Sequence, residues 1–394
     1  MNINGTFRFH NVGQGLFYSG ILNKKDTKSH SIFSFVYDCG TDSSMAFLMS
    51  DIDSFKLLLP TNEKKLDLLV ISHLHDDHVN GLEYLLKDIK VDTVVMPYID
   101  DGLKSLPLVE SSANSDFLRT FYLDPVNWFS LMGVRRVLFL GAESMEQKEI
   151  NLPSERPLNN DDSGLWIDPE SVLYTDSIGD TSIIYLRNLA SVRCNKFCWE
   201  FKFENLKLDS TLIDMYTNIV KGYIGTYKTL ENILKDKKIT KDLRDEINKN
   251  KKLKNMQNRT SVVFLHRPRA DKVIVQLNIC NCNNCRCWSP IKSNMDIWYS
   301  TVLTGDIELK KKELLQILPI DPDKQRYLVV QFPHHGAKND CNINYFSELH
   351  TITMVLSYGI TNKFGHPNGA VLSNLRRFNL VNERQAFDYQ ITVF

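Results

Sequence analysis

The chain has 394 residues, of which 43% are hydrophobic and 24% charged, which is the composition of a soluble globular protein with a substantial core. Its 47 lysines and arginines balance 47 aspartates and glutamates, so the net charge predicts no polyanionic partner, and any nucleic-acid surface must be local. The sequence has neither a leader-like start nor an apolar run of about 18 residues, so we expect a cytoplasmic protein that does not cross a membrane.

Strand and helix patterns alternate through the first 140 residues. Short runs rich in β-branched and aromatic residues are typical of strands, and longer amphipathic runs are typical of helices. The expected strands are residues 7–12, 16–19, 31–37, 66–71, 93–96 and 136–140. The expected helices are residues 43–59, a helix that follows His78, and residues 124–132. This alternation predicts an α/β sandwich.

The alternation is lost between residues 141 and 257, and we interpret this segment as an insertion. Residues 151–180 are rich in Asn, Asp, Ser, Pro and Gly, a composition typical of irregular structure. Residues 199–204 alternate between apolar and polar side chains, as a half-exposed strand does. Helices are expected at residues 210–223, 228–234 and 241–254, which makes the insertion mostly helical.

Strand patterns return after residue 258, and each of these strands ends near a glycine or near a residue that binds metals. The expected strands are residues 261–266, 272–277, 300–304, 327–332 and 351–357, and a last helix begins near Pro367. We therefore predict a single domain over residues 1–394, with a core of residues 1–140 and 258–394 and an insertion of residues 141–257.

Three of the ten histidines lie within six residues, in an H-x-H-x-D-H array formed by His73, His75, Asp77 and His78. The array directly follows an apolar run, so we expect it in the loop after a buried strand, where side chains converge on one point. Imidazole and carboxylate groups suit Zn, Mn or Fe. The alternative is a polar loop that only caps the next helix.

Three further candidate ligands, Asp306, His335 and His366, also follow predicted strands. Strands that end at the same edge of a sheet bring such residues into one site. For Asp306 the alternative role is the N-cap of a helix over residues 307–318. His334 is expected to be structural or to face substrate, because one of two adjacent residues normally points away from a site.

Together, these motifs resemble those of the metallo-β-lactamase superfamily, and more narrowly those of the hydrolase domain of ComEC-type competence proteins. The matching motifs, in chain order, are V-G-Q-G at 12–15, D-x-G at 38–40, S-H-x-H-x-D-H-x-x-G-L at 72–82, N-x-x-S-x-V at 258–263, L-T-G-D-I-E at 303–308, P-H-H-G at 333–336, and S-Y-G at 357–359 with G-H-P at 365–367. The resemblance covers about residues 5–140 and 258–394. It implies a four-layer αββα sandwich, with the insertion unmatched.

The resemblance also implies a site for two divalent metal ions, Zn or Mn. The implied ligands are His73 and His75 for the first ion, Asp77, His78 and His366 for the second, and Asp306 as a bridge between them. His335 is either a further ligand or a phosphate contact. The residues expected to orient ligands or to contact substrate are Asp38, Gln14, Asn258, Ser261, His334 and Lys338.

The sequence departs from the superfamily pattern at one ligand of the first ion. Many members supply another histidine between the H-x-H-x-D-H array and the bridging aspartate. The one histidine in that interval here is His266, which lies in the middle of a predicted strand and is expected to be an ordinary sheet residue. The first ion is therefore expected to keep an open position or a water molecule.

The implied activity is that of a binuclear metal-dependent phosphodiesterase, in particular a nuclease that cleaves DNA or RNA through a hydroxide bridging the two metals. Asp77, Asp306 and His335 are the expected catalytic residues, with His335 favoured to protonate the leaving oxygen. One alternative is a small-molecule metallo-hydrolase acting on cyclic nucleotides, thioesters or lactones. Another is a metal-containing subunit of a multi-protein bacterial complex of the defence type, with a protein partner docked on the insertion.

Two further clusters leave alternatives open. Residues 235–259 carry ten lysines and arginines against four acidic residues, and Lys249, Lys251, Lys252 and Lys254 form either a nucleic-acid surface or a solvated helical face. Residues 280–287 contain four cysteines. An additional structural zinc held by Cys194, Cys198, Cys282 and Cys285 is one interpretation, and free thiols are the other.

Overall fold

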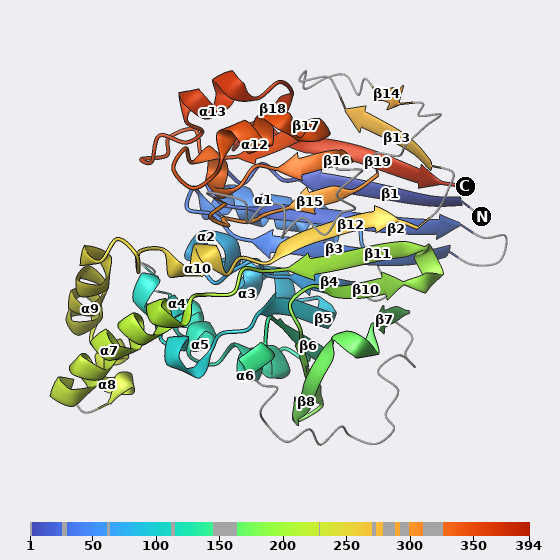
Figure 1. Ribbon diagram of the computed structural model, residues 1–394. Helices are drawn as coiled ribbons and strands as arrows, with labels where there is room; N and C mark the ends of the chain where they lie inside the picture. Colours follow the sequence, from blue (N-terminus) through green and yellow to red (C-terminus); the bar gives the residue numbers. More distant parts are fainter. Residues whose placement is uncertain are drawn as a thin grey trace.

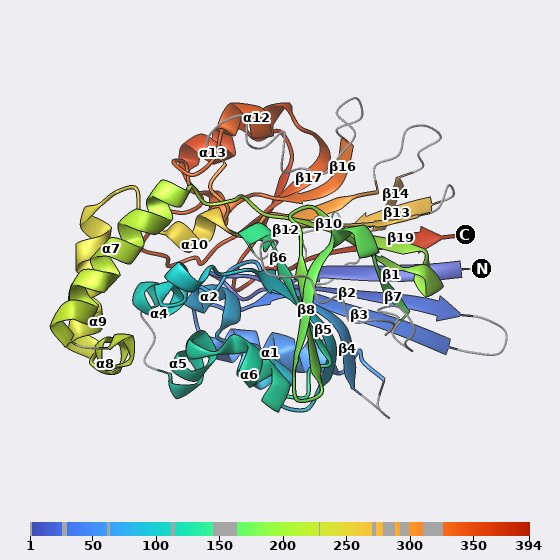
Figure 2. The same cartoon turned by 60° about the horizontal axis from the view of Figure 1, so that its bottom comes forward.

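The computed structural model describes residues 2–25, 30–60, 64–111, 115–144, 164–227, 229–269, 273–278, 288–291, 299–309 and 326–394. Two β-sheets stack face to face, and helices cover their outer faces (Figures 1 and 2). The predicted four-layer αββα sandwich is therefore confirmed. None of the helices in this described part of the chain is both long and apolar enough to span a membrane.

The two sheets contain most of the described strands. The first has the order β14 (Trp288–Ile291), β13 (Val273–Asn278), β19 (Phe387–Val393), β1 (Asn2–Phe9), β2 (Phe17–Lys25), β3 (His30–Cys39), β4 (Lys65–Val70), β5 (Lys90–Pro97), β6 (Arg136–Leu140), β9 (Thr181–Leu186) and β8 (Val172–Ile178). The second has the order β18 (Phe378–Val381), β17 (His350–Ser357), β16 (Arg326–Gln331), β15 (Thr301–Leu303), β12 (Val263–Pro268), β11 (Trp199–Glu204), β10 (Ala190–Cys194) and β7 (Leu165–Ile167).

The helices lie outside the sheets and at one end of the sandwich. They are α1 (Met45–Lys56), α2 (Asp76–Val79), α3 (Leu82–Leu86), α4 (Leu106–Glu110), α5 (Asp116–Leu123), α6 (Pro125–Leu131), α7 (Ser210–Tyr227), α8 (Leu230–Lys235), α9 (Lys237–Lys249), α10 (Met256–Arg259), α12 (Ile343–Glu348) and α13 (Gly369–Asn374). The short 3-10 turns are η1 (Asp101–Leu103), η3 (Pro169–Ser171), η4 (Asn195–Phe197) and η5 (His334–Gly336). Figure 2 shows α1, α5 and α6 on one side of the sandwich and α12 and α13 on the other.

Three main apolar cores hold these layers together, as four layers require. Successive side chains of a buried strand face opposite sides, so β4 serves two cores at once. Leu68 and Val70 pack in the core between the sheets, whereas Leu69 packs against the helices on the first sheet. The third core lies under α12 and α13 and includes Val330 and Phe346.

The parallel strands fix the position of the candidate site. Strands β3, β4, β5, β6 and β9 run parallel in the first sheet, and β15 to β18 run parallel in the second. Loops that follow the carboxyl ends of parallel strands meet at one rim. Asp38 lies at the C-terminal end of β3, and the segments that leave β4, β15, β16 and β17 carry the H-x-H-x-D-H array, Asp306, His334 with His335, and His366.

The segment expected to be an insertion divides into two parts. Residues 165–204 contain five strands that extend both sheets: β8 and β9 join the first, and β7, β10 and β11 join the second. The second part contains α7, α8 and α9, which project from the sandwich in Figure 1. The mostly helical character that we expected of residues 141–257 is therefore limited to this second part, because edge strands carry the chain through the first.

Candidate metal centre

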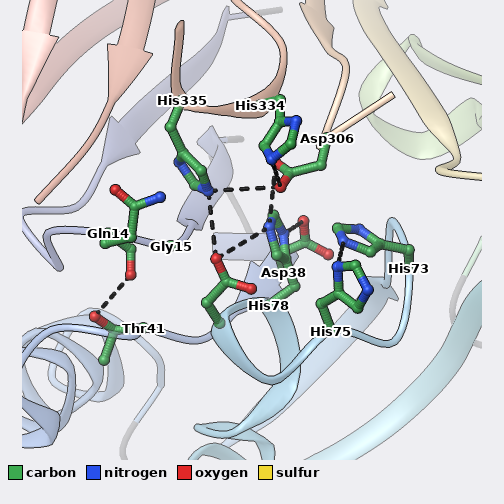
Figure 3. Close-up of polar contacts among 12 residues, drawn as sticks. Gln14, Gly15, Asp38, Thr41, His73, His75, His78, Asp306, His334 and His335 are labelled. Carbon is green, nitrogen blue, oxygen red and sulfur yellow. Dashed lines mark hydrogen bonds and ion pairs between the residues drawn. The ribbon is translucent and has the colours of Figure 1, made fainter. Parts of the chain in front are cut away.

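Four side chains from three separate segments meet at the rim. Their ligand atoms all lie within 4.8 Å of one another, and the residues are Asp77, His78, Asp306 and His335. Asp77 and His78 belong to α2, Asp306 follows β15, and His335 lies in η5 after β16. The structure therefore places Asp306 beside the array, where the sequence predicted it (Figure 3). Residues 310–325, which include most of the alternative helix, lie outside the described residues.

The buried atoms that face one another in this group lack hydrogen-bond partners. His78 donates from Nδ1 to Asp38 Oδ2 at 2.7 Å, and His335 donates from Nδ1 to the carbonyl oxygen of Ser357 at 2.9 Å. Each imidazole is thereby left with Nε2 directed into the group, and both Nε2 atoms and Asp306 Oδ1 are buried and unpartnered. Buried polar atoms normally have partners, so this donor set fits a metal ion.

The other half of the centre is formed by His73 and His75. His73 Nε2 lies 3.0 Å from His75 Nδ1, and Figure 3 shows the two rings turned toward each other. The remaining nitrogens are occupied, His73 Nδ1 by Ser72 Oγ at 2.9 Å and His75 Nε2 by Glu110 Oε2 at 2.9 Å. The rings of His73 and His78 are 4.2 Å apart between centroids, so the two halves are adjacent.

Asp38 is held in place beside the His78 imidazole. Its backbone is left-handed, with φ of 55°, and its carboxylate accepts hydrogen bonds from the N–H and the hydroxyl of Ser72 at 2.7 and 2.6 Å. Those bonds fix the carboxylate that orients His78. The D-x-G motif also has a steric reason: a Cβ on Gly40 would lie 2.5 Å from the backbone of Asp77, so only glycine lets β3 approach the array.

Both histidines of the P-H-H-G segment face the site, and His334, which was expected to be structural or to face substrate, lines the cavity. The general expectation that adjacent side chains point to opposite sides does not hold here. That expectation assumed an extended backbone, but His334 and His335 both have left-handed backbones, with φ of 47° and 54°. The Nε2 atoms of His334 and His335 lie 3.7 and 3.6 Å from Asp306 Oδ2. His334 Nδ1 pairs with Asp340 at 2.6 Å.

His366 lies outside the four-residue group, which includes His335. The ring of His366 is 5.5 Å from that of His334 and 6.4 Å from that of His335 between centroids. It lines the cavity over the centre, and its Nδ1 is buried without a partner. The turn at His335 places its Nε2 3.3 Å from Asp77 Oδ2.

Burial and neighbouring charges set the protonation of the centre. Burial and the nearby imidazoles of His78 and His75 hold the pKa of His73 well below its usual value. Burial alone would lower the pKa of His78, but the charges of Asp306, Asp77 and Asp38 raise it well above the usual value. Several carboxylates packed in one buried group need compensating positive charge, from protons or from cations.

Other predicted residues line the cavity or lie away from it. Gln14 and Asn258 line the cavity, Gln14 accepts a hydrogen bond from the Gly359 N–H at 3.3 Å, and Asn258 has a buried, unpartnered Oδ1. Ser261 is fully buried with no partner for its hydroxyl. Lys338 is exposed and is absent from the described residues that line the cavity.

His266 is an ordinary sheet residue, as predicted. It is fully buried in β12, where its Nε2 lies 2.7 Å from the Tyr18 hydroxyl. Burial lowers the pKa of His266 to about 3, so the imidazole is neutral. The sandwich core rather than the metal centre surrounds this side chain.

The cysteine and lysine clusters gain no role in the centre. Cys194 is buried, and burial raises the pKa of its thiol to about 12. Cys198 is partly exposed, while Cys282 and Cys285 lie outside the described residues. The lysines at 249, 251, 252 and 254 are exposed, and the described lining of the cavity includes none of them.

Sequence reasoning missed several residues that contact the centre or line its cavity. They include Glu110, Arg244, Asp340 and Phe364. Glu110 and Arg244 lie on helices far from the array in sequence, and neither belongs to a recognisable motif. Asp340 lies shortly after the P-H-H-G segment, and Phe364 lies directly before the G-H-P segment. Closeness to a motif was the one signal available for these two residues.

Comparisons with known proteins agree with this geometry. Residues 33–169 match the metallo-beta-lactamase superfamily. The chain is also 30% identical over 95 residues to ComE operon protein 3 of Bacillus subtilis (strain 168), a match that spans 22% of this chain and 12% of that protein. Superfamily members are generally metal-dependent hydrolases, and the Asp and His group fits divalent cations. Residues 33–169 are thus similar to the metallo-beta-lactamase superfamily, and part of the chain is similar to a segment of a ComE operon protein.

Proposed function

We propose that the chain is a two-metal phosphodiesterase that cleaves nucleic acid. The observation that carries the proposal is the convergence of Asp77, His78, Asp306 and His335 within 4.8 Å beside the facing nitrogens of His73 and His75. His73 and His75 would hold one ion, and Asp77, His78 and His335 the other. When bound, two divalent ions, Zn or Mn, activate a water molecule and the phosphate that it attacks.

Asp306 is the residue that we propose to lie between the two ions, because its carboxylate contacts His78, whose ring is adjacent to that of His73 in the other half. Oδ1 lies 3.3 Å from His78 Nε2, and Oδ2 lies 3.6 Å from His335 Nε2. Asp38 contributes indirectly, by keeping the His78 ring in one orientation.

His334 is the residue that we propose as proton donor to the leaving oxygen. His335, which the sequence favoured for this step, has Nδ1 bound to the Ser357 carbonyl oxygen and Nε2 inside the ligand group. His334 lines the cavity, and Asp340 binds its Nδ1 at 2.6 Å, an arrangement that orients the ring and leaves Nε2 on the side of the centre.

The mouth of the cavity offers a flat apolar surface for a base. Phe364 is 62% exposed and its ring stacks on His366 with centroids 5.8 Å apart. Asn362 fixes the loop by accepting hydrogen bonds from the N–H groups of Phe364 and His366 at 3.1 and 3.0 Å. An aromatic ring held rigidly beside a phosphate-cleaving centre is suited to stack an unpaired base.

A second candidate is hydrolysis of a small phosphodiester such as a cyclic nucleotide. It is supported by the lining of the cavity, where Arg244 is the one lysine or arginine among the described residues. Lys249, on the neighbouring surface, pairs with Glu246 at 2.6 Å. A long polyanion would gain little from such a lining, whereas a small substrate needs only the metal centre.

One experiment separates these functions. The purified chain is loaded with Mn or Zn and given single- and double-stranded DNA and RNA, cyclic nucleotides and bis(p-nitrophenyl) phosphate, with Asp306→Asn as the inactive control. Cleavage of strands that Asp306→Asn abolishes supports the nuclease. Turnover of cyclic nucleotides alone supports the second candidate, and turnover that survives in Asp306→Asn would contradict both.

A further inference from the structure

Glu110 is the C-terminal residue of α4, and its carboxylate reaches the metal centre from outside the ligand motifs. Its Oε2 lies 2.9 Å from Nε2 of His75, and the Glu110 side chain is 10% exposed. The other nitrogen of that imidazole, Nδ1, faces His73 Nε2 at 3.0 Å. Glu110 and His73 therefore occupy opposite sides of the same ring.

The hydrogen bonds of Glu110 determine which nitrogen of His75 carries the proton. Glu110 accepts from the Met256 N–H at 2.9 Å and from Gln257 Nε2 at 3.0 Å, so the group acts as an acceptor. A carboxylate that accepts also from His75 places the proton on Nε2 and leaves the Nδ1 lone pair free. Ligand histidines commonly donate their second N–H to a carboxylate in this way.

Asp38 provides the same arrangement in the other half of the centre. There the carboxylate accepts from His78 Nδ1 at 2.7 Å, and Nε2 is the free nitrogen. Each half thus has one imidazole oriented by one buried carboxylate. Asp38 belongs to a recognisable motif, whereas Glu110 does not.

We infer that Glu110 is the positioning residue of the first metal half, and that α9 and α10 hold it in place; this inference rests on the proposed two-metal function. Met256 and Gln257 of α10 donate to the Glu110 side chain. Arg244 of α9 donates to the carbonyl oxygens of Val109 and Ser111, on either side of Glu110. The helical segment is therefore built into the support of the centre.

A purely structural role for Glu110, as an anchor for α10, makes a different prediction. Loss of an anchor would lower the stability of the fold and leave the His75 tautomer unchanged. Loss of a positioning carboxylate would change the His75 tautomer and weaken one of the two metal-binding steps. Metal affinity and the imidazole tautomer therefore distinguish the two roles without relying on activity.

The test uses Glu110→Gln in the full chain, in which one oxygen that now accepts hydrogen bonds becomes an NH2 group. Glu143→Gln is the matched control, because Glu143 also accepts a backbone hydrogen bond, from Asn188 at 2.6 Å, but does not contact the ligand residues. Zn titration calorimetry measures both binding steps, and the ¹⁵N shifts of the metal-free protein report the His75 tautomer. Gln257→Leu, which keeps the carboxylate and removes one of its donors, is the second variant should Glu110→Gln not fold.

We expect Glu110→Gln to weaken one metal step by about 10- to 100-fold and to leave the other step within about twofold, with a mixture of His75 tautomers. Glu143→Gln should match the wild type, and Gln257→Leu should weaken the same step severalfold. Two wild-type binding steps in both Glu110→Gln and Gln257→Leu, with an unchanged His75 tautomer, would overturn the inference. A wild-type chain that binds no metal would instead overturn the proposed function.

Discussion

His78 donates its Nδ1 proton to Asp38 across 2.7 Å, and both side chains are fully buried. Asp38→Asn replaces part of that acceptor and leaves the volume unchanged, so the His78 ring loses its fixed tautomer. We expect metal affinity to fall by about 10- to 100-fold, measured by Zn titration.

The matched control for that change is Asp67→Asn. Asp67 is also a buried carboxylate that accepts a backbone hydrogen bond, from the Ser34 N–H at 2.9 Å, but it belongs to β4 away from the rim. Equal losses of metal affinity in both variants would show that buried carboxylates matter here only for folding.

The role proposed for His334 predicts a dependence on the leaving group. A proton donor accelerates loss of a poor leaving group by about 10²- to 10⁴-fold and matters little for p-nitrophenolate. His334→Gln should therefore retain most turnover of bis(p-nitrophenyl) phosphate and lose most cleavage of an oligonucleotide. Equal losses on both substrates would instead point to His334 as a metal ligand.

Phe364 provides a test of substrate class. If its ring stacks an unpaired base, Phe364→Ala should raise KM for single-stranded oligonucleotides by about 5- to 100-fold, since base stacking contributes about 1–3 kcal/mol. Phe364→Trp should restore binding, and bis(p-nitrophenyl) phosphate should be turned over normally by both variants. Unchanged KM values for Phe364→Ala on every strand tested would rule out the stacking role.

Glu204 predicts a pH dependence of stability away from the centre. Burial raises the pKa of this carboxyl from 4.5 to about 7, and its Oε2 has no partner. Between these values the folded chain holds a proton that the unfolded chain has lost, so the contribution of Glu204 to stability falls as pH rises from 4.5 to 7.

Glu204→Gln removes this titration. The free energy of unfolding of the variant minus that of the wild type should therefore increase by up to about 3 kcal/mol as pH rises from 4.5 to 8, since one pKa unit corresponds to 1.36 kcal/mol. Urea denaturation at the two pH values measures the difference. The exposed Glu83→Gln serves as control, and a wild-type-minus-variant difference that does not vary with pH would contradict the account.

The sequence alone predicted those parts of the candidate site whose residues are close together in the chain or follow parallel strands. His73 and His75 lie in the loop after β4, and Asp77 and His78 lie in the short helix α2 that directly follows, so the close spacing of the array keeps the four side chains together. Asp306 could be predicted to lie near this array because the carboxyl ends of parallel strands meet at one rim.

What the sequence did not predict depends on backbone conformation and on long-range packing. The choice of His335 over His366 depends on two consecutive left-handed residues, an uncommon conformation for histidine that residue type does not specify. Glu110 reaches His75 only because α9 and α10 pack against α4. Of the five strands in residues 165–204, the one at residues 199–204 was predicted. The other four were missed, because pairing with neighbouring strands rather than their own pattern defines them.

Anomalous diffraction from crystals of the Zn-loaded chain tests the central claim most directly. The account predicts two peaks at the rim, one between His73 and His75 and one among Asp77, His78 and His335, with Asp306 beside both. Zn peaks found only elsewhere, or an empty rim in crystals of a chain that cleaves phosphodiesters, would contradict it.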